Sequence, residues 1–263
     1  MDLGIKGDSA LVTASSSGLG RASAAALAVE GVNVAVNGRD EGKLDRAVTE
    51  LRELGSGRVI GVRGDLTDGE DITEMVGKVV EKFGGIDHLV TCAGGPPSKP
   101  FLDTSEEEWY RSYDLLVMSV VRTVKECVPY LRESPRGTIV NITSISVKEA
   151  IDNLVLSNSV RMAVIGLMKT LSSELAPEVR VNAVLPGYTE TDRVKELIEQ
   201  AVERGEIDGY EEGLQNFSSD VPLERIASPE ELGEVVAFLS SEKGSYVNGV
   251  SIPVDGGLSR SNL

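Results

Sequence analysis

A glycine- and serine-rich turn reads Thr13-Ala14-Ser15-Ser16-Ser17-Gly18-Leu19-Gly20 and joins two segments of different character. Residues 10–13 form a short, mostly apolar run that is typical of a strand. Residues 21–30 are expected to form a helix that ends at Gly31. In such a strand–turn–helix unit, glycines let backbone amides approach an anion, and the N-terminus of the helix adds positive potential. The turn is therefore predicted to cradle the pyrophosphate of a dinucleotide.

The same alternation of apolar runs and amphipathic stretches continues outward from this turn. Further strands are expected at residues 32–36, 59–62, 87–91, 138–142, 180–185 and 250–254, and further helices at 41–54, 71–83, 106–131, 154–175 and 229–239. The pattern predicts an α/β fold, a doubly wound Rossmann-type parallel sheet with helices on both faces. Because no linker or internal repeat divides the chain, residues 1–263 are expected to form one domain, with a variable substrate segment at about 188–220.

Composition excludes several classes of function. The 263 residues carry 42 Asp and Glu against 26 Lys and Arg, a net charge of −16, which disfavours nucleic acid and anionic membrane surfaces as partners. No apolar run approaches the roughly 18 residues of a membrane span, and the N-terminus does not resemble a signal peptide, so a cytoplasmic location is expected. Two cysteines and one histidine leave no zinc motif, and no metal is predicted.

The residues after the second and third strands bear on the choice of cofactor. Arg39 follows the second strand, at the place where a carboxylate selects NAD and an arginine accommodates the 2′-phosphate of NADP. NADP(H) is therefore favoured, with NAD(H) as the alternative, and an ordinary solvated arginine is the competing interpretation. Asp65 is placed to bond the adenine, and Asp68 is expected to cap the next helix.

Several segments together resemble the short-chain dehydrogenase/reductase family, from about Ile5 to Gly257. Residues 13–20 resemble its TGxxxGxG loop, with Ala14 in place of the first glycine, and residues 91–94 keep the last two letters of its NNAG segment. Arg180-Val181-Asn182-Ala183-Val184 with Pro186-Gly187 resembles its RVNxVxPG stretch, and Thr191 is the threonine that follows. The segments at 222–225, 228–231 and 254–257 are similar to its C-terminal signatures.

This resemblance implies which residues bind cofactor and substrate. Those expected at the cofactor are Thr13, Ser15, Ser16, Ser17, Gly18, Leu19, Gly20, Arg39, Asp65, Leu66, Ala93, Gly94, Arg161, Pro186, Gly187, Thr189 and Thr191. Gly95 and Tyr188 are expected to line the substrate pocket. Members of the family assemble as dimers or tetramers through two long central helices, so a homo-oligomer with a small-molecule substrate is expected.

The catalytic residues depart from the family pattern. The family uses a serine, a tyrosine 13 residues later as general acid/base, a lysine four residues after that, and often an upstream asparagine. Ser144 matches the serine, but Ser157 stands at the tyrosine position, Arg161 at the lysine position and Leu116 at the asparagine position. No tyrosine occurs between Tyr130 and Tyr188, so no shift of register recovers one.

These replacements change the proton chemistry. A serine hydroxyl is far less acidic than a phenol, and an arginine keeps its proton near neutral pH. Ser144, Ser157 and Arg161 are the catalytic candidates of an NADP(H)-dependent oxidoreductase that acts on a carbonyl or alcohol with a non-standard proton donor. The alternatives are a catalytically silent cofactor-binding protein, or a dehydratase or isomerase on the same frame.

Other residues give weaker indications. Tyr188 is a candidate replacement acid, although packing at the pocket wall is the favoured interpretation. Ser159 is a second hydroxyl that could orient a water beside Ser157. His88 is expected at the surface or at a hinge, and Cys92 and Cys127 as reduced, buried thiols.

Overall fold

The protein is described by a computed structural model that covers residues 2–261, except for the side chain at position 193. Within that range seven strands form one sheet: β1 (Ser9–Val12), β2 (Asn33–Gly38), β3 (Val59–Arg63), β4 (His88–Thr91), β5 (Gly137–Ile142), β6 (Val179–Pro186) and β7 (Ser251–Val254). The α-helices are α1 (Gly18–Val29), α2 (Glu41–Arg52), α3 (Gly69–Phe83), α4 (Glu106–Tyr113), α5 (Ser119–Glu133), α6 (Val155–Glu174), α7 (Asp192–Glu203), α8 (Tyr210–Ser219) and α9 (Pro229–Ser240).

Every strand pair is parallel, and the order across the sheet is β3-β2-β1-β4-β5-β6-β7. The order reverses direction between β1 and β4, which is the switch point at which doubly wound sheets bind ligands beyond the carboxyl ends of their strands. The predicted α/β class, Rossmann-type sheet and single-domain architecture are confirmed.

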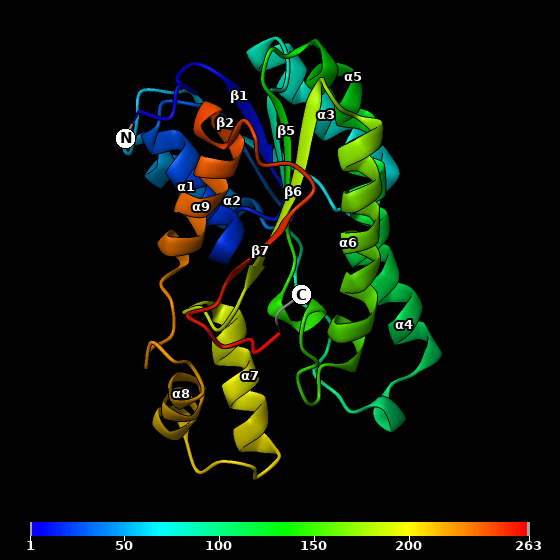
Figure 1. The fold of residues 1–263 in the computed structure, drawn as a ribbon, viewed down its shortest axis with the longest axis vertical. Coiled ribbons are helices and arrows are strands. Elements are labelled where there is room, and N and C mark those ends of the chain that lie inside the picture. The colour runs from blue at the N-terminus through cyan, green and yellow to red at the C-terminus, as the bar shows by residue number, and fades with distance from the viewer. Residues whose placement is uncertain (1, 262–263) are drawn as a thin grey trace.

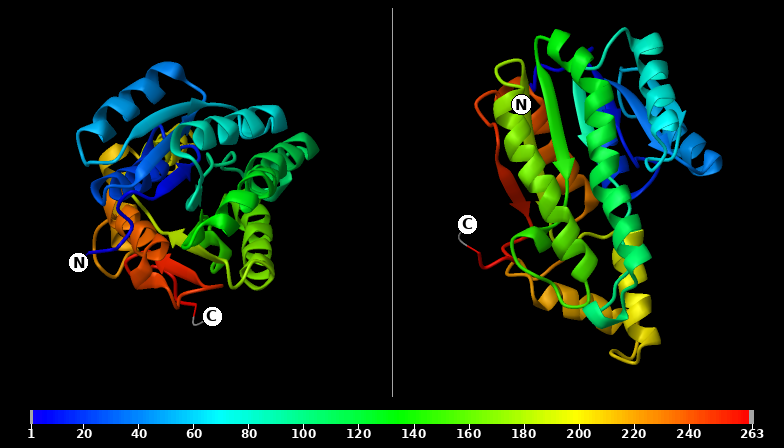
Figure 2. Two further views of the ribbon diagram at one scale, coloured as in Figure 1. Left: turned by 90° about the horizontal axis from the view of Figure 1, so that it is seen from above. Right: turned by 90° about the vertical axis from the view of Figure 1, so that its right-hand side faces the viewer.

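Helices cover both faces of the sheet, as Figures 1 and 2 show. Alternate residues of β1 explain the two layers: Leu11 packs beneath α3, α5 and α6, whereas Ala10 and Val12 pack against α1, α2 and α9. All three side chains are fully buried, because a parallel sheet covered on both faces is apolar on both. The two layers hold the carboxyl ends of the strands rigidly together.

Two elements differ from the expectations. The helix expected at 106–131 is broken by a π-helical turn at Asp114–Met118, which separates α4 from α5. Such a turn inserts an extra residue into the helical ladder and is found often at functional sites. The charged segment after β6 folds into α7 and α8, which lie together at the lower end of the molecule in Figure 1.

The expected surface position of His88 is wrong. His88 is fully buried at the start of β4, where its ring nitrogens lie 3.1 Å from Asp8 Oδ2 and 2.9 Å from Thr138 Oγ1. Arg136 completes this cluster at the edge of the sheet opposite the switch point, donating from Nε to Asp8 at 3.0 Å. The cluster connects three strands and is structural.

Within residues 2–261, no helix is long and apolar enough to cross a bilayer. In the same range, no group of three or more His, Cys, Asp or Glu side chains is arranged to hold a metal ion.

Candidate active site

A cavity of about 530 Å³ lies beyond the carboxyl ends of the strands, around the switch point. Loops after six of the seven strands line it, so residues far apart in the sequence meet there. The predicted site residues in its lining are Ser16, Ser17, Gly18, Leu19, Arg39, Asp65, Leu66, Ala93, Gly94, Gly95, Ser144, Ser157, Arg161, Pro186, Gly187, Tyr188, Thr189 and Thr191.

Three residues of the predicted cofactor loop lie outside the lining and serve the backbone instead. Thr13 Oγ1 donates to the carbonyl oxygen of Cys92 at 2.7 Å and accepts from its amide at 2.8 Å, which fastens β1 to β4. Ser15 Oγ donates to the carbonyl oxygen of Val12 at 2.6 Å. A Cβ at Gly20 would stand 2.5 Å from the carbonyl oxygen of Ala14, so only glycine allows α1 to approach the turn.

A buried side-chain amide, that of Asn37, holds the loop in place, a role that no pattern in the sequence predicts. Ala14 has a left-handed φ of 45° where the family loop has glycine. Its amide donates to Asn37 Oδ1 at 2.9 Å, and Asn37 Nδ2 donates to the carbonyl oxygens of Val62 and Gly64 at 3.2 Å. Asn37 therefore couples the first turn to the ends of β2 and β3 and offsets part of the strain at Ala14.

Two basic side chains mark the outer end of the cavity. Arg39 is 75% exposed and reaches Asp65 Oδ2 at 3.3 Å, and Lys43, in the first turn of α2, lines the same space. Burial would raise the pKa of Asp65, but hydrogen bonds from Thr67 and Arg39 hold it below its ordinary value. Asp65 is therefore an ionised partner that steers Arg39, while Arg39 and Lys43 give this end of the cavity positive charge.

The inner end contains the three catalytic candidates in one hydrogen-bonded group. Arg161, on α6, donates from Nε to Ser157 Oγ at 3.2 Å and from Nη1 to the carbonyl oxygen of Thr143 at 3.2 Å. The hydroxyl oxygens of Ser157 and Ser146 lie 3.3 Å apart, and the Ser146 amide donates to Ser144 Oγ at 3.1 Å. Ser146 is buried and was missed from the sequence, because a contact across 11 residues has no periodic signature.

The wall of this inner end is largely apolar. Gly95 and Pro96 lie on one side, and Tyr188 and Leu197 on the other. The Tyr188 ring packs against Phe217 of α8 at a centroid distance of 4.4 Å. Burial and the nearby Asp220 carboxylate raise the pKa of Tyr188, so its phenol stays protonated at neutral pH. Ser159, the second hydroxyl considered as a water ligand, is exposed and lies outside the cavity lining.

Both thiols are free, and they have different surroundings. Cys127 is buried in the core beneath the sheet, as expected. Cys92 is only partly buried and lines the cavity, where burial raises the pKa of its thiol and the Arg161 charge opposes that rise. A raised pKa makes Cys92 a weak nucleophile.

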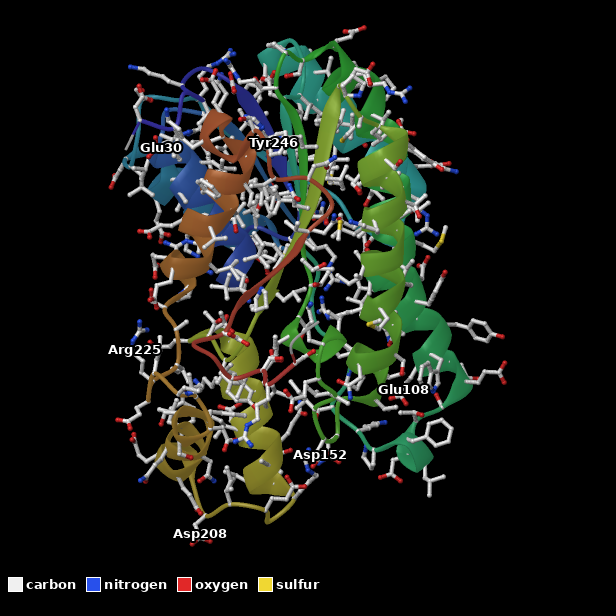
Figure 3. The ribbon with its side chains drawn as sticks, in the orientation of Figure 1. Glu30, Glu108, Asp152, Asp208, Arg225 and Tyr246 are labelled. Carbon is white, nitrogen blue, oxygen red and sulfur yellow. The ribbon has the colours of Figure 1, made fainter. Side chains whose placement is uncertain are left out.

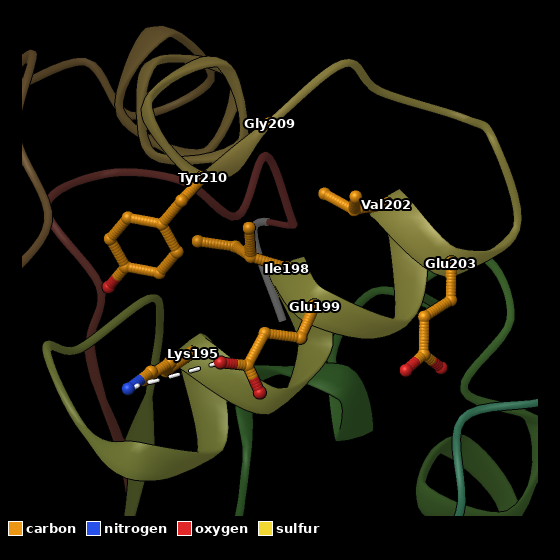
Figure 4. A pocket seen from close by; sticks show the side chains of 7 residues that line it. All are labelled: Lys195, Ile198, Glu199, Val202, Glu203, Gly209 and Tyr210. Carbon is orange, nitrogen blue, oxygen red and sulfur yellow. Dashed lines mark ion pairs between the residues drawn. The ribbon is translucent and has the colours of Figure 1, made fainter.

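A second hollow, of about 620 Å³, lies between α7 and the start of α8 (Figure 4). Ile198, Val202 and Tyr210 form its apolar part, and the Lys195–Glu199 ion pair at 3.9 Å lies along its edge. None of the predicted site residues lines it. This hollow is therefore separate from the candidate site.

Comparisons with known proteins agree with this architecture. Residues 13–259 match the family model described as enoyl-(acyl carrier protein) reductase. The human dehydrogenase/reductase SDR family member 2, mitochondrial, is 35% identical over 249 residues, covering 94% of this chain and 85% of its own. The 3-oxoacyl-(acyl-carrier-protein) reductase of Thermotoga maritima is 34% identical over 255 residues, covering 97% and 98%.

Two solved structures have folds similar to that of this chain. The L-sorbose reductase of Gluconobacter frateurii, in complex with NADPH and L-sorbose, superposes with a TM-score of 0.93 at 33% identity, covering 99% of this chain and all of that one. An actinorhodin polyketide ketoreductase variant with NADPH gives a TM-score of 0.91 at 31% identity, covering 96% and 97%. The chain belongs to the short-chain dehydrogenase/reductase family of oxidoreductases.

Proposed function

We propose that this protein is an NADP(H)-dependent oxidoreductase that acts on a carbonyl or alcohol without the family's tyrosine and lysine. One observation carries the proposal: a single cavity has Arg39 and Lys43 at its outer end and Ser144, Ser157 and Arg161 at its inner end. The first pair suits a nucleotide phosphate, and the second group suits a reacting oxygen. The NADPH complexes of two similar proteins support the choice of cofactor.

The backbone around the first turn fits a dinucleotide. Gly18 has a φ of 56°, and a Cβ added there would meet only a Thr191 methyl group at 3.9 Å, so the turn leaves open space above its amides. Ser16 and Ser17 line the same space, and the N-terminus of α1 adds positive potential for a pyrophosphate. Arg39 and Lys43 would hold a 2′-phosphate. When bound, the cofactor supplies or accepts a hydride.

The residues of this chain would then act on the substrate oxygen. Ser144 orients the carbonyl through its hydroxyl, and Arg161 attracts negative charge that develops on the oxygen. The hydroxyl of Ser157 accepts from Arg161, so its own proton is directed to Ser146 or into the cavity. Proton delivery by water beside Ser157 replaces delivery by a tyrosine.

The segment at about 188–220 is the proposed substrate-selecting part, because Tyr188, Val194 and Leu197 form one wall of the inner cavity. A dimer or tetramer through the outer faces of α5 and α6 is the proposed assembly, and the half-exposed Met162 on α6 lies on such a face. Light scattering of the purified chain tests the assembly.

A second candidate, a cofactor-binding protein without turnover, is favoured by the loss of the tyrosine and lysine at positions 157 and 161. One experiment separates the two candidates. NADPH binding is measured by its fluorescence, and consumption of NADPH against a panel of carbonyl compounds is followed in the same sample. The oxidoreductase predicts consumption that Ser144→Ala slows about 100-fold while NADPH binding is retained. Binding without consumption on any carbonyl supports the silent protein.

A further inference from the structure

The inner end of the cavity presents hydrogen-bond donors to whatever oxygen binds there. Ser144 Oγ accepts from the Ser146 amide, so its own proton points elsewhere, and the cavity borders it. Ser157 Oγ likewise accepts from Arg161 Nε. Ser157 belongs to the first turn of the 20-residue helix α6 and Leu154 is its N-cap, so the positive end of this helix faces the same space. A permanent cation, two hydroxyls and a helix N-terminus together suit a negatively charged oxygen.

None of these donors releases a proton near neutral pH, since serine hydroxyls are not acidic there and guanidinium groups stay protonated. Two other protonated groups line the inner end of the cavity, the thiol of Cys92 and the phenol of Tyr188, whereas Lys43 lies at the outer end. Burial raises the pKa of both, so each is a poorer proton donor than its free counterpart. The site is therefore equipped to hold an anion and poorly equipped to protonate one.

We infer that Arg161, Ser157 and Ser144 form an oxyanion-binding site and that the substrate is a conjugated carbonyl compound, an enone or a quinone. This inference rests on the proposed function. Hydride addition to an isolated ketone places a full charge on an alkoxide, which needs a proton as it forms. Hydride addition to an enone leaves a delocalised enolate, which the donors of this site stabilise without protonating it.

The reduction of an enone adds one hydride and one proton to the substrate. A hydride from NADPH forms a bond to the β-carbon of the enone, and the electron pair of the carbon–carbon double bond moves through the carbonyl to its oxygen. The cofactor is oxidised to NADP⁺ and the substrate is reduced to an enolate bound by Arg161. Water then protonates the α-carbon, which yields the saturated ketone, and the hydroxide that remains takes up a proton from the solvent. With a quinone, hydride addition yields the hydroquinone monoanion, which takes up its proton from water in the same way.

The walls of the inner cavity are largely apolar, which suits an uncharged substrate. Leu115, Ile145, Ile151, Leu154, Val194 and Leu197 line it together with the ring of Tyr188. The Tyr188–Phe217 contact fixes the face of that ring against α8. The adjoining segment 190–220 contains ten Asp and Glu against three Lys and Arg, a difference of seven, which disfavours anionic substrates at the cavity mouth.

The first test measures anion binding without any turnover. 4-Nitrophenol is added to the NADP⁺ complex, and its yellow phenolate is titrated by absorbance. An oxyanion site favours the phenolate, so the apparent pKa of the bound ligand falls, and Arg161→Gln removes most of that shift. The exposed Arg132 on α5 provides the control, because Arg132→Gln should leave the shift intact. An unshifted pKa in the wild type overturns the oxyanion site.

The second test compares cyclohex-2-enone with cyclohexanone, with menadione as the quinone. Enone and quinone reduction are expected to exceed ketone reduction about 100-fold in kcat/KM, the scale of a lost or gained oxyanion donor. With deuterated NADPH, mass spectrometry should find the label on the β-carbon of the enone product. Equal rates for enone and ketone, or a label on the carbonyl carbon, overturn the inference and leave the proposed function standing.

The two tests distinguish a failure of this inference from a failure of the proposed function. No reduction of any acceptor by a protein that binds NADPH contradicts the proposed function, whatever the nitrophenol result. Tyr188→Phe and Cys92→Ala complete the design, because each removes one of the other protons that line the inner end of the cavity. Loss of enone reduction in either one identifies a protein acid and overturns the assignment of protonation to water.

Discussion

At the scale of single residues, we propose that Arg39 and Lys43 determine the choice between NADPH and NADH. Arg39→Ala is expected to weaken NADPH binding about tenfold to a hundredfold, because a charged hydrogen bond to phosphate is lost. NADH lacks that phosphate, so its affinity should change little and serves as the internal control. Fluorescence titration with both cofactors measures the effect. Equal losses for NADPH and NADH would show that Arg39 supports the loop rather than the phosphate.

A second residue-scale prediction concerns the missing acid. The double variant Ser157→Tyr with Arg161→Lys restores the family's residue types on the same turn of α6. A phenol beside an ammonium group can donate a proton, so reduction of saturated ketones should rise about tenfold or more. Steady-state assays on cyclohexanone check this, with circular dichroism to confirm folding. A folded double variant that remains inactive on ketones contradicts the view that positions 157 and 161 set the chemistry.

At the scale of elements, α1 and α9 pack at backbone contact. A Cβ at Gly233 of α9 would lie 2.6 Å from the carbonyl oxygen of Ala22 on α1. Gly233→Ala is therefore expected to force the helices apart and cost about 1–3 kcal/mol of unfolding free energy. Gly77, on the exposed side of α3, has no atom within 4 Å of an added Cβ. Gly77→Ala should instead stabilise by about 0.5–1 kcal/mol through helix propensity.

Chemical denaturation of the two glycine variants provides the measurement. The sign should differ between them, because the substitution is the same and only the packing differs. A Gly233→Ala variant as stable as the wild type would mean that α9 can shift at no cost, and the close α1–α9 contact would then carry no stability.

The order of elements was readable from the sequence because each apolar run is short and each is followed by an amphipathic stretch. Gly84 illustrates this: it ends α3 with a left-handed φ of 91°, as the Gly84-Gly85 pair indicated. Asp68 caps the same helix, as expected, by accepting from the amides of Glu70 and Asp71. The π-helical turn at Asp114–Met118, which contacts α6, was not readable, because the pattern over 106–131 predicts one continuous helix.

The candidate site was predictable only where position in the fold decides a role. Residues beyond strand ends reach the cavity, as Arg39 and Ser144 do. A serine hydroxyl of the first turn faces either the cavity or a backbone group that needs a hydrogen-bond partner. The Ser15 hydroxyl is buried because it donates to the carbonyl oxygen of Val12. Asn37 and Ser146 bond to residues distant in the chain, and a single sequence contains no signal for such pairs.

At the scale of the whole molecule, the cluster of Asp8, His88 and Arg136 joins the amino ends of the neighbouring strands β1, β4 and β5. Burial would raise the pKa of Asp8, but hydrogen bonds from His88 and Arg136 hold it below its ordinary value of 3.8. Because the folded pKa is the lower one, the stabilisation is present above about pH 4 and is lost as pH falls through the folded value. Asp8→Asn should lower the Tm at neutral pH and flatten its fall in acid. The exposed Asp208, between α7 and α8 (Figure 3), provides the control, and an equal response of Asp208→Asn and Asp8→Asn would contradict this role of Asp8.

The net charge of −16 predicts a dependence of stability on salt. Mutual repulsion of surface carboxylates destabilises the compact state, and molar salt reduces the Debye length to about 3 Å. The Tm should therefore rise between low and molar KCl. Differential scanning fluorimetry measures this, and a Tm that does not respond to KCl would show that the acidic surface does not limit stability.

We propose that one cavity binds NADPH and reduces a carbonyl compound without a tyrosine. A stopped-flow experiment tests it directly, by mixing the preformed NADPH complex with the panel of ketones, enones and quinones and following NADPH absorbance. NADPH should be consumed with a conjugated acceptor, and Ser144→Ala should slow this consumption about 100-fold while NADPH binding is retained. NADPH that binds tightly and stays unoxidised with every acceptor would contradict it.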